Sequence, residues 1–276
     1  MPYSSYIKSL LDLTSQYKAV QTPQTSVNRK VEDPQGTVLI FSPHPDDECI
    51  IGAAALKFQD QAKYRIVNVA VTHGSDKARQ AARLEELKGA CTHLGFELHC
   101  IGDSGLEDVK PSTRENAPEE WAEKVAAIKD ILEHYNPDCI IYPHEKDWNG
   151  THIGVFHLLR DALALMGPEF TTRCLESEYW GGIYQPNLMI ELSEDDVSLL
   201  INALAFHVGE IERNPYHVTV PLFMMDAVRR GAELIGGQGG AAPDFQFATI
   251  YNHGTWANGG FTQAESQILS KSDSFE

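Results

Sequence analysis

The sequence is poor in positive charge. Its 276 residues contain 22 Lys and Arg against 39 Asp and Glu, so the formal net charge at pH 7 is −17. A protein that binds nucleic acid or an anionic membrane surface needs clustered cations that face phosphates. The composition therefore predicts neither partner.

Long hydrophobic runs are also lacking. No stretch approaches the roughly 20 apolar residues that a membrane-spanning helix needs. Residues 1–18 show no basic region followed by an apolar core of the kind that marks a secretory signal. The five cysteines have no CxxC spacing and sit mostly in apolar runs, which is typical of reduced core thiols. We expect a cytoplasmic protein without a membrane span, and the sequence leaves homo-oligomer formation open.

The chain divides into a short appendage and one large unit. Residues 1–18 have weak helical spacing and are followed by a polar, linker-like stretch. We expect residues 1–35 to form a helix and linker packed on the main domain, and residues 36–276 to form a single domain.

From Gly36 onward, short β-branched runs alternate with long amphipathic ones. Strands are predicted at TVLIF, YRIVNVAVT, FELHCIG and CIIYP, and helices at residues 50–58, 77–94, 118–134 and 152–165. This alternation predicts a doubly wound α/β fold, with a mainly parallel sheet and helices on both faces. After about residue 167 the alternation fades, so we expect a smaller, irregular C-terminal region that completes the pocket, with a helix near residues 195–208 and a glycine-rich flap or rim at 231–240.

Ligands of such sheets bind beyond the carboxyl ends of the strands. Directly after TVLIF come His44, Asp46, Asp47 and Glu48, interrupted by two prolines. His44 and Asp47 are three residues apart at a turn into a helix, so both can reach one cation, and an N/O ligand set suits Zn²⁺ or another divalent metal such as Fe²⁺. The two aspartates alone could be helix-capping acids, but capping does not require a histidine between prolines.

A third metal ligand is expected from the loop after CIIYP. His144 ends that strand and His152 begins the next helix, so either side chain could reach the same edge of the sheet. His157 is expected to pack on its helix instead.

Several motifs together resemble the PIG-L (LmbE-like) family. They are PHPDDE after a buried strand, RxxE beginning at Arg83, Leu94-Gly95, and a late histidine at a helix start. The similarity extends over roughly residues 36–210. The resemblance implies a Rossmann-like fold and metal-dependent deacetylation of N-acetylglucosaminyl and related N-acyl sugar conjugates.

The resemblance also implies roles for individual residues. The family's zinc ligands fall on His44, Asp47 and His152, its general base falls on Asp46, and its sugar-binding arginine falls on Arg83. Arg83 could alternatively pair with Glu86 on the surface of its helix.

One window departs from the family pattern. Where the family often has Asp-x-His-Pro-Asp-His, this chain has Asp147-Trp148-Asn149-Gly150-Thr151-His152. The histidine that assists the tetrahedral intermediate is therefore missing, and the candidates to replace it are His144, His253 and Asn149. Asp147 is retained and predicted to bind substrate.

Aromatic residues of the C-terminal region could stack on a sugar ring. Trp180 and His253 are predicted to bind substrate; the wider set of candidates for this wall is Tyr179, Tyr184, Tyr251 and Trp256.

These observations predict a hydrolase: a zinc-dependent N-deacetylase that releases acetate from an amino-sugar conjugate. Two alternatives stay open at this point. One is an amidase for a longer acyl chain or a thiol-sugar conjugate, and the other is a non-catalytic carbohydrate-binding relative in which Asn149 and Thr151 mark lost chemistry. A dinucleotide-binding enzyme is disfavoured, because no glycine fingerprint follows the first strand.

Overall fold

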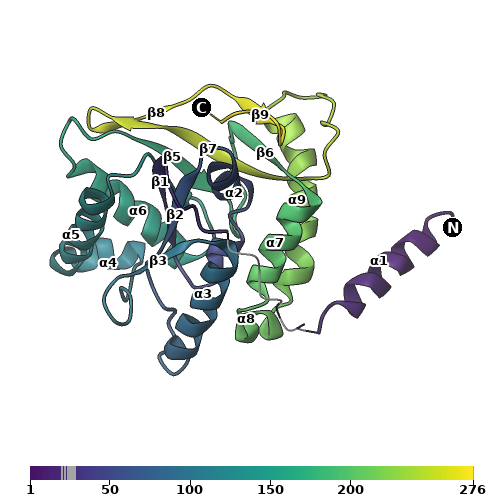
Figure 1. The fold of residues 1–276 in the computed structure, drawn as a ribbon, viewed down its shortest axis with the longest axis horizontal. Helices are drawn as coiled ribbons and strands as arrows, with labels where there is room; N and C mark the ends of the chain where they lie inside the picture. The colour runs from purple at the N-terminus through teal and green to yellow at the C-terminus, as the bar shows by residue number, and fades with distance from the viewer. Residues whose placement is uncertain (20, 22, 24–28, 276) are drawn as a thin grey trace.

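One mixed sheet of nine strands organises the fold in a computed structural model, which describes residues 1–19, 21, 23 and 29–275 (Figure 1). The strand order is β3-β2-β1-β4-β5-β7-β6-β9, and β8 pairs with β7. The strands are β1 (Gly36–Ser42), β2 (Tyr64–Ala70), β3 (Glu97–Cys100), β4 (Cys139–Pro143), β5 (Thr172–Ser177), β6 (Leu188–Leu192), β7 (Phe247–Ala257), β8 (Gly260–Gln263) and β9 (Gln267–Leu269). Strands β1 to β5 pair in parallel, whereas β7 runs antiparallel to β5, β6 and β8.

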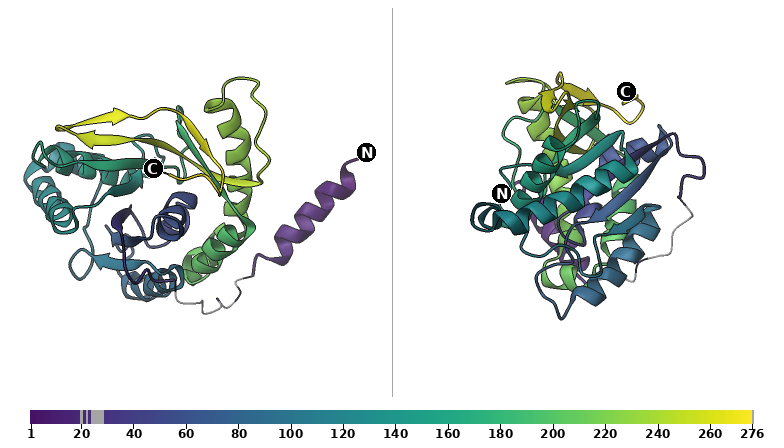
Figure 2. Two further views of the ribbon diagram at one scale, coloured as in Figure 1. Left: turned by 45° about the horizontal axis from the view of Figure 1, so that its top comes forward. Right: turned by 90° about the vertical axis from the view of Figure 1, so that its left-hand side faces the viewer.

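Helices cover both faces of this sheet (Figures 1 and 2). The helical segments are α1 (Ser4–Gln16), the 3₁₀ turn η1 (Asp47–Cys49), α2 (Ala53–Asp60), α3 (Gln80–Leu94), α4 (Pro111–Asn116), α5 (Pro118–Tyr135), α6 (Gly150–Ala164), α7 (Glu194–Leu204), α8 (Val208–Arg213) and α9 (Tyr216–Leu234).

The central strand β1 supplies side chains to two separate cores. Val38 and Ile40 pack with residues of α2, α3 and α7, while Leu39 and Phe41 pack with residues of α5 and α6. All four are fully buried, as expected for a parallel strand covered on both sides. The predicted α/β fold, mainly parallel with helices on both faces, is confirmed.

The C-terminal region is more regular than the sequence predicts. It contains the long helix α9 and strands β6 to β9, of which β7 is antiparallel to β6 and β8 while β9 is parallel to β6. The helix predicted at 195–208 ends earlier, at Leu204 as α7, and the separate helix α8 begins at Val208. The glycine-rich segment 231–240 begins inside α9, whose last residue is Leu234. Among the described residues, no helix is long and apolar enough to cross a membrane.

The N-terminal helix α1 differs from the packing that we expected. None of its residues is buried, and it projects away from the sheet and its helices in both views (Figures 1 and 2). A contact with the body lies at its end, where the Nε2 atom of His217 is 2.7 Å from the carbonyl oxygen of Tyr17.

Helix α6 approaches the segment before α4 at a glycine. A methyl group added at Gly154 would lie 2.3 Å from the carbonyl oxygen of Val109, whereas one added at Gly150, on the same helix, would meet nothing within 4 Å. Gly154 therefore permits close contact between α6 and the backbone at Val109, and a larger residue at this position would push the two segments apart.

We predict that Gly154→Ala lowers the free energy of unfolding by about 1–3 kcal/mol, because the added methyl overpacks the contact. Gly150→Ala is the matched control and should change stability by no more than about 1 kcal/mol. Urea denaturation of the two variants measures both values. Equal stability of the two variants would show that the contact is not tight.

Candidate active site

The candidate site lies where the strand order reverses. β1 pairs with β2 on one side and with β4 on the other, so successive connections diverge from the β1/β4 boundary. Ligands of open α/β sheets bind at such a point, beyond the carboxyl ends of the strands. His44 and Asp47 follow β1, and His152 is the third residue of α6, the helix that follows β4.

Three side-chain atoms converge there into a nearly equilateral triangle. The Nδ1 atom of His44 lies 3.2 Å from Nε2 of His152, and the Oδ2 atom of Asp47 lies 3.4 Å from each of these nitrogens. Asp47 and His152 are almost fully buried. Although burial opposes ionisation, the two imidazoles hold the pKa of Asp47 well below its usual range.

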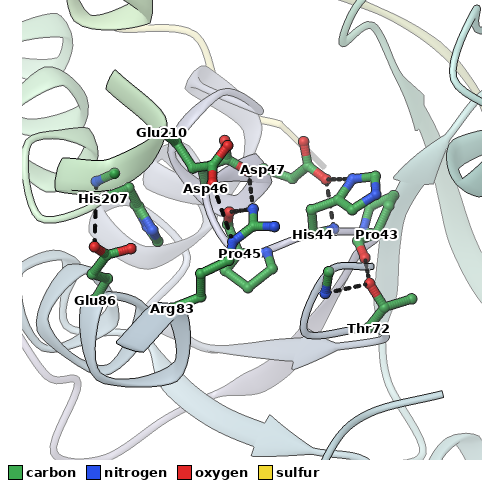
Figure 3. Close-up of polar contacts among 12 residues, drawn as sticks. Pro43, His44, Pro45, Asp46, Asp47, Thr72, Arg83, Glu86, His207 and Glu210 are labelled. Atoms are coloured by element: carbon green, nitrogen blue, oxygen red, sulfur yellow. Dashed lines mark hydrogen bonds and ion pairs between the residues drawn. The ribbon is translucent and has the colours of Figure 1, made fainter. Parts of the chain in front are cut away.

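Local hydrogen bonds fix the turn that carries this set. Asp47 Oδ2 accepts a 2.8 Å hydrogen bond from the backbone N–H of His44, and the Thr72 hydroxyl donates to the carbonyl oxygen of Pro43 over 2.7 Å (Figure 3). The prolines on either side of His44 have fixed φ angles and no N–H, so the turn does not continue as α-helix. Asp46 has a φ of +117°, a conformation that non-glycine residues rarely adopt.

A buried carboxylate stands behind His152. Asp147 Oδ2 lies 3.6 Å from His152 Nδ1 and accepts the backbone N–H groups of Trp180 and Gly181, while its Oδ1 accepts that of Asn149 over 2.9 Å. Burial alone would lower the pKa of His152, but Asp47 and Asp147 outweigh it and raise that pKa to about 10. Asp147 thus orients the imidazole and ties two loops together.

Asp46 points toward an arginine rather than toward the triangle of ligand atoms. Its Oδ1 is 3.7 Å from Nη2 of Arg83, which also donates to the carbonyl oxygen of Pro45 over 2.8 Å, and Nε of Arg83 is 3.6 Å from Oε1 of Glu210 (Figure 3). Burial and the neighbouring Asp47 carboxylate raise the pKa of Asp46 well above its usual range. Arg83 does not form the helix-surface pair with Glu86, whose carboxylate lies 3.5 Å from Arg79 instead.

A two-part cleft opens over these side chains. One part has a volume of about 430 Å³ and is lined by His44, Asp46, Asp47, Ser75, Asp76, Arg79, Arg83, Asn149, Trp180, Glu210, Arg213 and Tyr216. The other, of about 450 Å³, shares His44, Ser75 and Asn149 with it and extends along Lys77, Gln80 and residues 106–110. Both volumes are in the range of small-molecule sites.

The structure brings most predicted site residues to this cleft. His44, Asp46, Asp47, Arg83, Asn149 and Trp180 line it, and His152 lies beside its floor. Asn149 caps α6, with its Oδ1 accepting the N–H of Thr151.

Three predicted residues lie elsewhere, and their placement corrects our expectation. His144 is buried with both ring nitrogens engaged: Nε2 lies 2.8 Å from the carbonyl oxygen of Gly181, and Nδ1 accepts the N–H of Lys146. Asp147 is buried behind His152, away from the cleft lining. His253 is on β7, where its Nε2 lies 3.0 Å from the carbonyl oxygen of Glu265.

Of the other predicted aromatics, none lines the cleft. Tyr179 packs edge-on against His152, Tyr184 is exposed on the surface, and Tyr251 and Trp256 belong to the cores.

The sequence predicts that the C-terminal region completes the pocket, but it does not identify which residues of that region line the cleft. Glu210 and Arg213 come from α8, and Tyr216 begins α9 with its ring centroid 4.8 Å from that of Trp180. Their sequence, GEIERNPY, carries no catalytic motif, and its charges resemble those of an ordinary exposed helix. These three residues are recognised as site residues only because the fold places them in the cleft lining.

The family comparison agrees with this geometry. The PIG-L family model, described as GlcNAc-PI de-N-acetylase, matches residues 39–163, which include the triangle of ligand atoms and Asp46. Residues 39–163 are therefore similar to the PIG-L family. The PIG-L match ends before α7, so Glu210, Arg213 and Tyr216 lie outside it. No protein of curated function matches the sequence.

Solved structures with the same fold have low sequence identity to this chain. The N,N′-diacetylchitobiose deacetylase of Pyrococcus horikoshii is 17% identical, with 92% of each chain covered and a TM-score of 0.59. The teicoplanin deacetylase Orf2 is 13% identical, with 84% of this chain and all of that chain covered and a TM-score of 0.56. The 4-carboxy-2-hydroxymuconate hydratase GalB of Pseudomonas putida is 16% identical, with 79% and 96% covered and a TM-score of 0.55. Because a hydratase shares the fold with deacetylases, the reaction has to be argued from the site.

We predict that Asp147→Asn lowers the free energy of unfolding at neutral pH by about 1–3 kcal/mol. Both carboxylate oxygens of Asp147 accept backbone N–H groups, and in asparagine one of these oxygens becomes an NH₂ group, which cannot accept them. Burial opposes ionisation of Asp147, but hydrogen bonds from His152 and from backbone N–H groups lower its pKa. Its contribution is therefore complete above the unfolded value of about 3.9 and is lost as the pH falls through the lowered folded value.

The difference in the free energy of unfolding between wild type and Asp147→Asn should accordingly become smaller as the pH falls. Denaturation at several pH values measures it, with the exposed Asp130→Asn on α5 as the control that changes little. A difference that stayed constant down to pH 2 would contradict the assignment.

Proposed function

We propose that the protein is a metal-dependent N-deacetylase, which hydrolyses the acetamido group of an N-acetylglucosamine-type sugar conjugate to acetate and a free amine. The observation that carries this proposal is the triangle formed by His44, Asp47 and His152, with the carboxylate of Asp46 beside it in the cleft. A hydrolytic site needs both an electrophilic centre and a base.

The donor set fits a tetrahedral cation. Bonds of about 2.0–2.1 Å at tetrahedral angles separate two ligand atoms by roughly 3.3–3.4 Å, close to the separations of 3.2–3.4 Å between the three donor atoms. His44 Nδ1, Asp47 Oδ2 and His152 Nε2 would hold the metal, and Asp147 would orient His152 from behind. Zinc suits this N₂O set best, and Fe²⁺ would accept it. When bound, such an ion acts as a Lewis acid that polarises the amide carbonyl and lowers the pKa of water.

Asp46 is the proposed general base. It is an immediate neighbour of Asp47, lines the cleft and is not needed as a ligand. Burial and the neighbouring Asp47 raise its pKa, so its carboxylate binds a proton more strongly than an exposed one does, as a general base requires. Asp46 would take a proton from the attacking water and pass it to the nitrogen of the leaving amine.

Asn149 is the proposed donor to the oxyanion. Its Oδ1 is used in capping α6, and no hydrogen bond occupies its Nδ2 among the described residues. His144 is a poorer candidate, because both of its ring nitrogens already have backbone partners. A preorganised donor of this kind typically contributes about 3 kcal/mol to the transition state.

The cleft suits a substrate larger than one monosaccharide. Arg83 offers a guanidinium to hydroxyl or anionic groups, and the paired rings of Trp180 and Tyr216 offer an apolar face for a pyranose. The second part of the cleft leaves space for the group attached to the sugar. The solved structures with this fold include deacetylases of diacetylchitobiose and of teicoplanin, which supports a conjugate of this size.

Free acetate released from N-acetylglucosamine conjugates tests the proposal. The probes are the monosaccharide, diacetylchitobiose and inositol-linked forms, with zinc-loaded protein and a chelated control. Acetate that appears only with metal supports the deacetylase. Release of a longer acyl group but no acetate would favour the alternative amidase, and binding without any release would favour a carbohydrate-binding protein.

We predict that Asp46→Asn abolishes turnover, lowering kcat roughly 10²–10⁴-fold, because a neutral amide cannot accept the proton. Bound metal, measured by elemental analysis, should stay at the wild-type ratio since Asp46 is not a ligand. Wild-type activity in this variant would remove Asp46 as the base.

His152→Ala, unlike Asp46→Asn, should lose the bound metal. Loss of one of three ligands should lower the metal affinity by at least about 10-fold, so the dialysed variant should contain little metal. His157→Ala, on the same helix, is the matched control and should retain it. A full complement of metal in His152→Ala would exclude His152 as a ligand.

A further inference from the structure

A fully buried glutamate connects the two halves of the site. Glu48 is 0% exposed and follows Asp47 directly, but its carboxylate turns away from the cleft. Its Oε2 accepts the backbone N–H of Asp46 over 3.0 Å, and its Oε1 lies 2.6 Å from Nε2 of His207 and accepts the Cys49 thiol over 3.2 Å. Every contact of this carboxylate is therefore internal.

His207, the partner, comes from a distant part of the chain. It is also 0% exposed and occupies the N-cap position of α8, the helix that carries Glu210 into the cleft. Its hydrogen bond to Glu48 spans 159 residues of sequence. A buried ionisable pair of this kind adds little net stability compared with apolar residues of similar size. We therefore ask which part of the structure the pair holds in place.

The residue that this pair holds is the one with the unusual backbone. Asp46 has a φ of +117° and a ψ of −25°, and a non-glycine residue stays in such a conformation only when its surroundings over-determine it. Glu48 holds the N–H of Asp46, while Arg83 faces its carboxylate at 3.7 Å. Both the backbone N–H and the side-chain carboxylate of Asp46 are thus held by other residues.

These contacts close into a ring. Asp46 faces Arg83, and Arg83 faces Glu210 on α8 (Figure 3). The N-cap residue of α8 is His207, which bonds to Glu48, and Glu48 accepts the N–H of Asp46. The ring uses the C-terminal region to fix a turn that follows the first strand.

We propose that Glu48 and His207 are positioning residues, which hold the backbone of Asp46 in its left-handed conformation so that its carboxylate faces the substrate cleft while Asp47 turns toward the two histidines. This inference rests on the proposed function only in that Asp46 acts as the base. Neither residue needs to touch the substrate, and neither is a metal ligand.

The test compares variants that keep or remove the acceptor for the Asp46 N–H. Glu48→Gln retains one: its amide oxygen can accept from Asp46, and its amide nitrogen can donate to His207, whose Nδ1 has no partner among the described residues and can carry the ring proton. The double variant Glu48→Leu with His207→Leu removes both polar groups, which avoids leaving one of them buried and unpaired. Glu48→Asp is the second, milder variant, since its side chain is one methylene too short to reach both partners.

We expect the double variant and Glu48→Asp to lower kcat for acetate release roughly 10²-fold. KM and the bound metal should stay within about 3-fold of wild type, and Glu48→Gln should retain kcat within about 5-fold, because the contacts of substrate and metal are unchanged. In an Asp46→Asn background the double variant should lower kcat no more than about 2-fold further, because the residue that it positions is already inactive. Gln59→Leu, which removes a buried polar side chain of α2 away from the cleft, is the matched control.

Crystal structures supply a readout that does not depend on activity. They are compared for wild type, Glu48→Gln and whichever of the double variant and Glu48→Asp is more stable. Asp46 should keep its positive φ in the first two and leave it in the third. A variant without the acceptor that keeps both this φ and wild-type kcat overturns the positioning role. If the wild type releases no acetate from any probe, the proposed function fails, and the φ of Asp46 in the variants still decides whether Glu48 and His207 position it.

Discussion

The pairing of β1 with β4 is the constraint on which the candidate site depends. The two strands are more than 90 residues apart in sequence, yet Val38 lies opposite Cys139 and Ile40 opposite Ile141 in the parallel register. This register brings the turn after β1 and the loop after β4 to one edge of the sheet. The separation of 3.4 Å between Asp47 and His152 is a consequence of that pairing, and the hydrophobic burial of both strands maintains it.

The sequence predicted those parts of the molecule that repeat a local pattern. Strand β1 is a run of mostly β-branched and aromatic residues, and α5 has clear apolar spacing. The predicted bounds of α3, α5 and α6 agree with the observed ones to within about three residues. The turn at His44 to Asp47 was found because its residue types are unusual together. These features depend on neighbours in sequence and can therefore be read from it.

The parts that escaped prediction depend on contacts between distant residues. Helix α9 contains Pro221, which predicts a break, but this proline lies in its second turn and removes only one intrahelical hydrogen bond. Tyr216 and Glu210 become cleft residues because α8 and α9 pack beside α3 and α7, which no local pattern records. His144 and His253 were expected in the cleft as replacements for the family histidine that is missing at Asn149, whereas both are engaged with backbone carbonyl groups.

The site is divided between two parts of the chain. The turn after β1 and the loop after β4 lie within the segment that the family model matches, and the wall formed by α8 and α9 lies outside it. The inner residues of the site and the wall of the cleft therefore come from separate segments of the chain. The hydrogen bond between Glu48 and His207 joins these segments, so a chimaera that exchanged the C-terminal region between two relatives would inherit a new cleft wall and would also need a matching partner for Glu48.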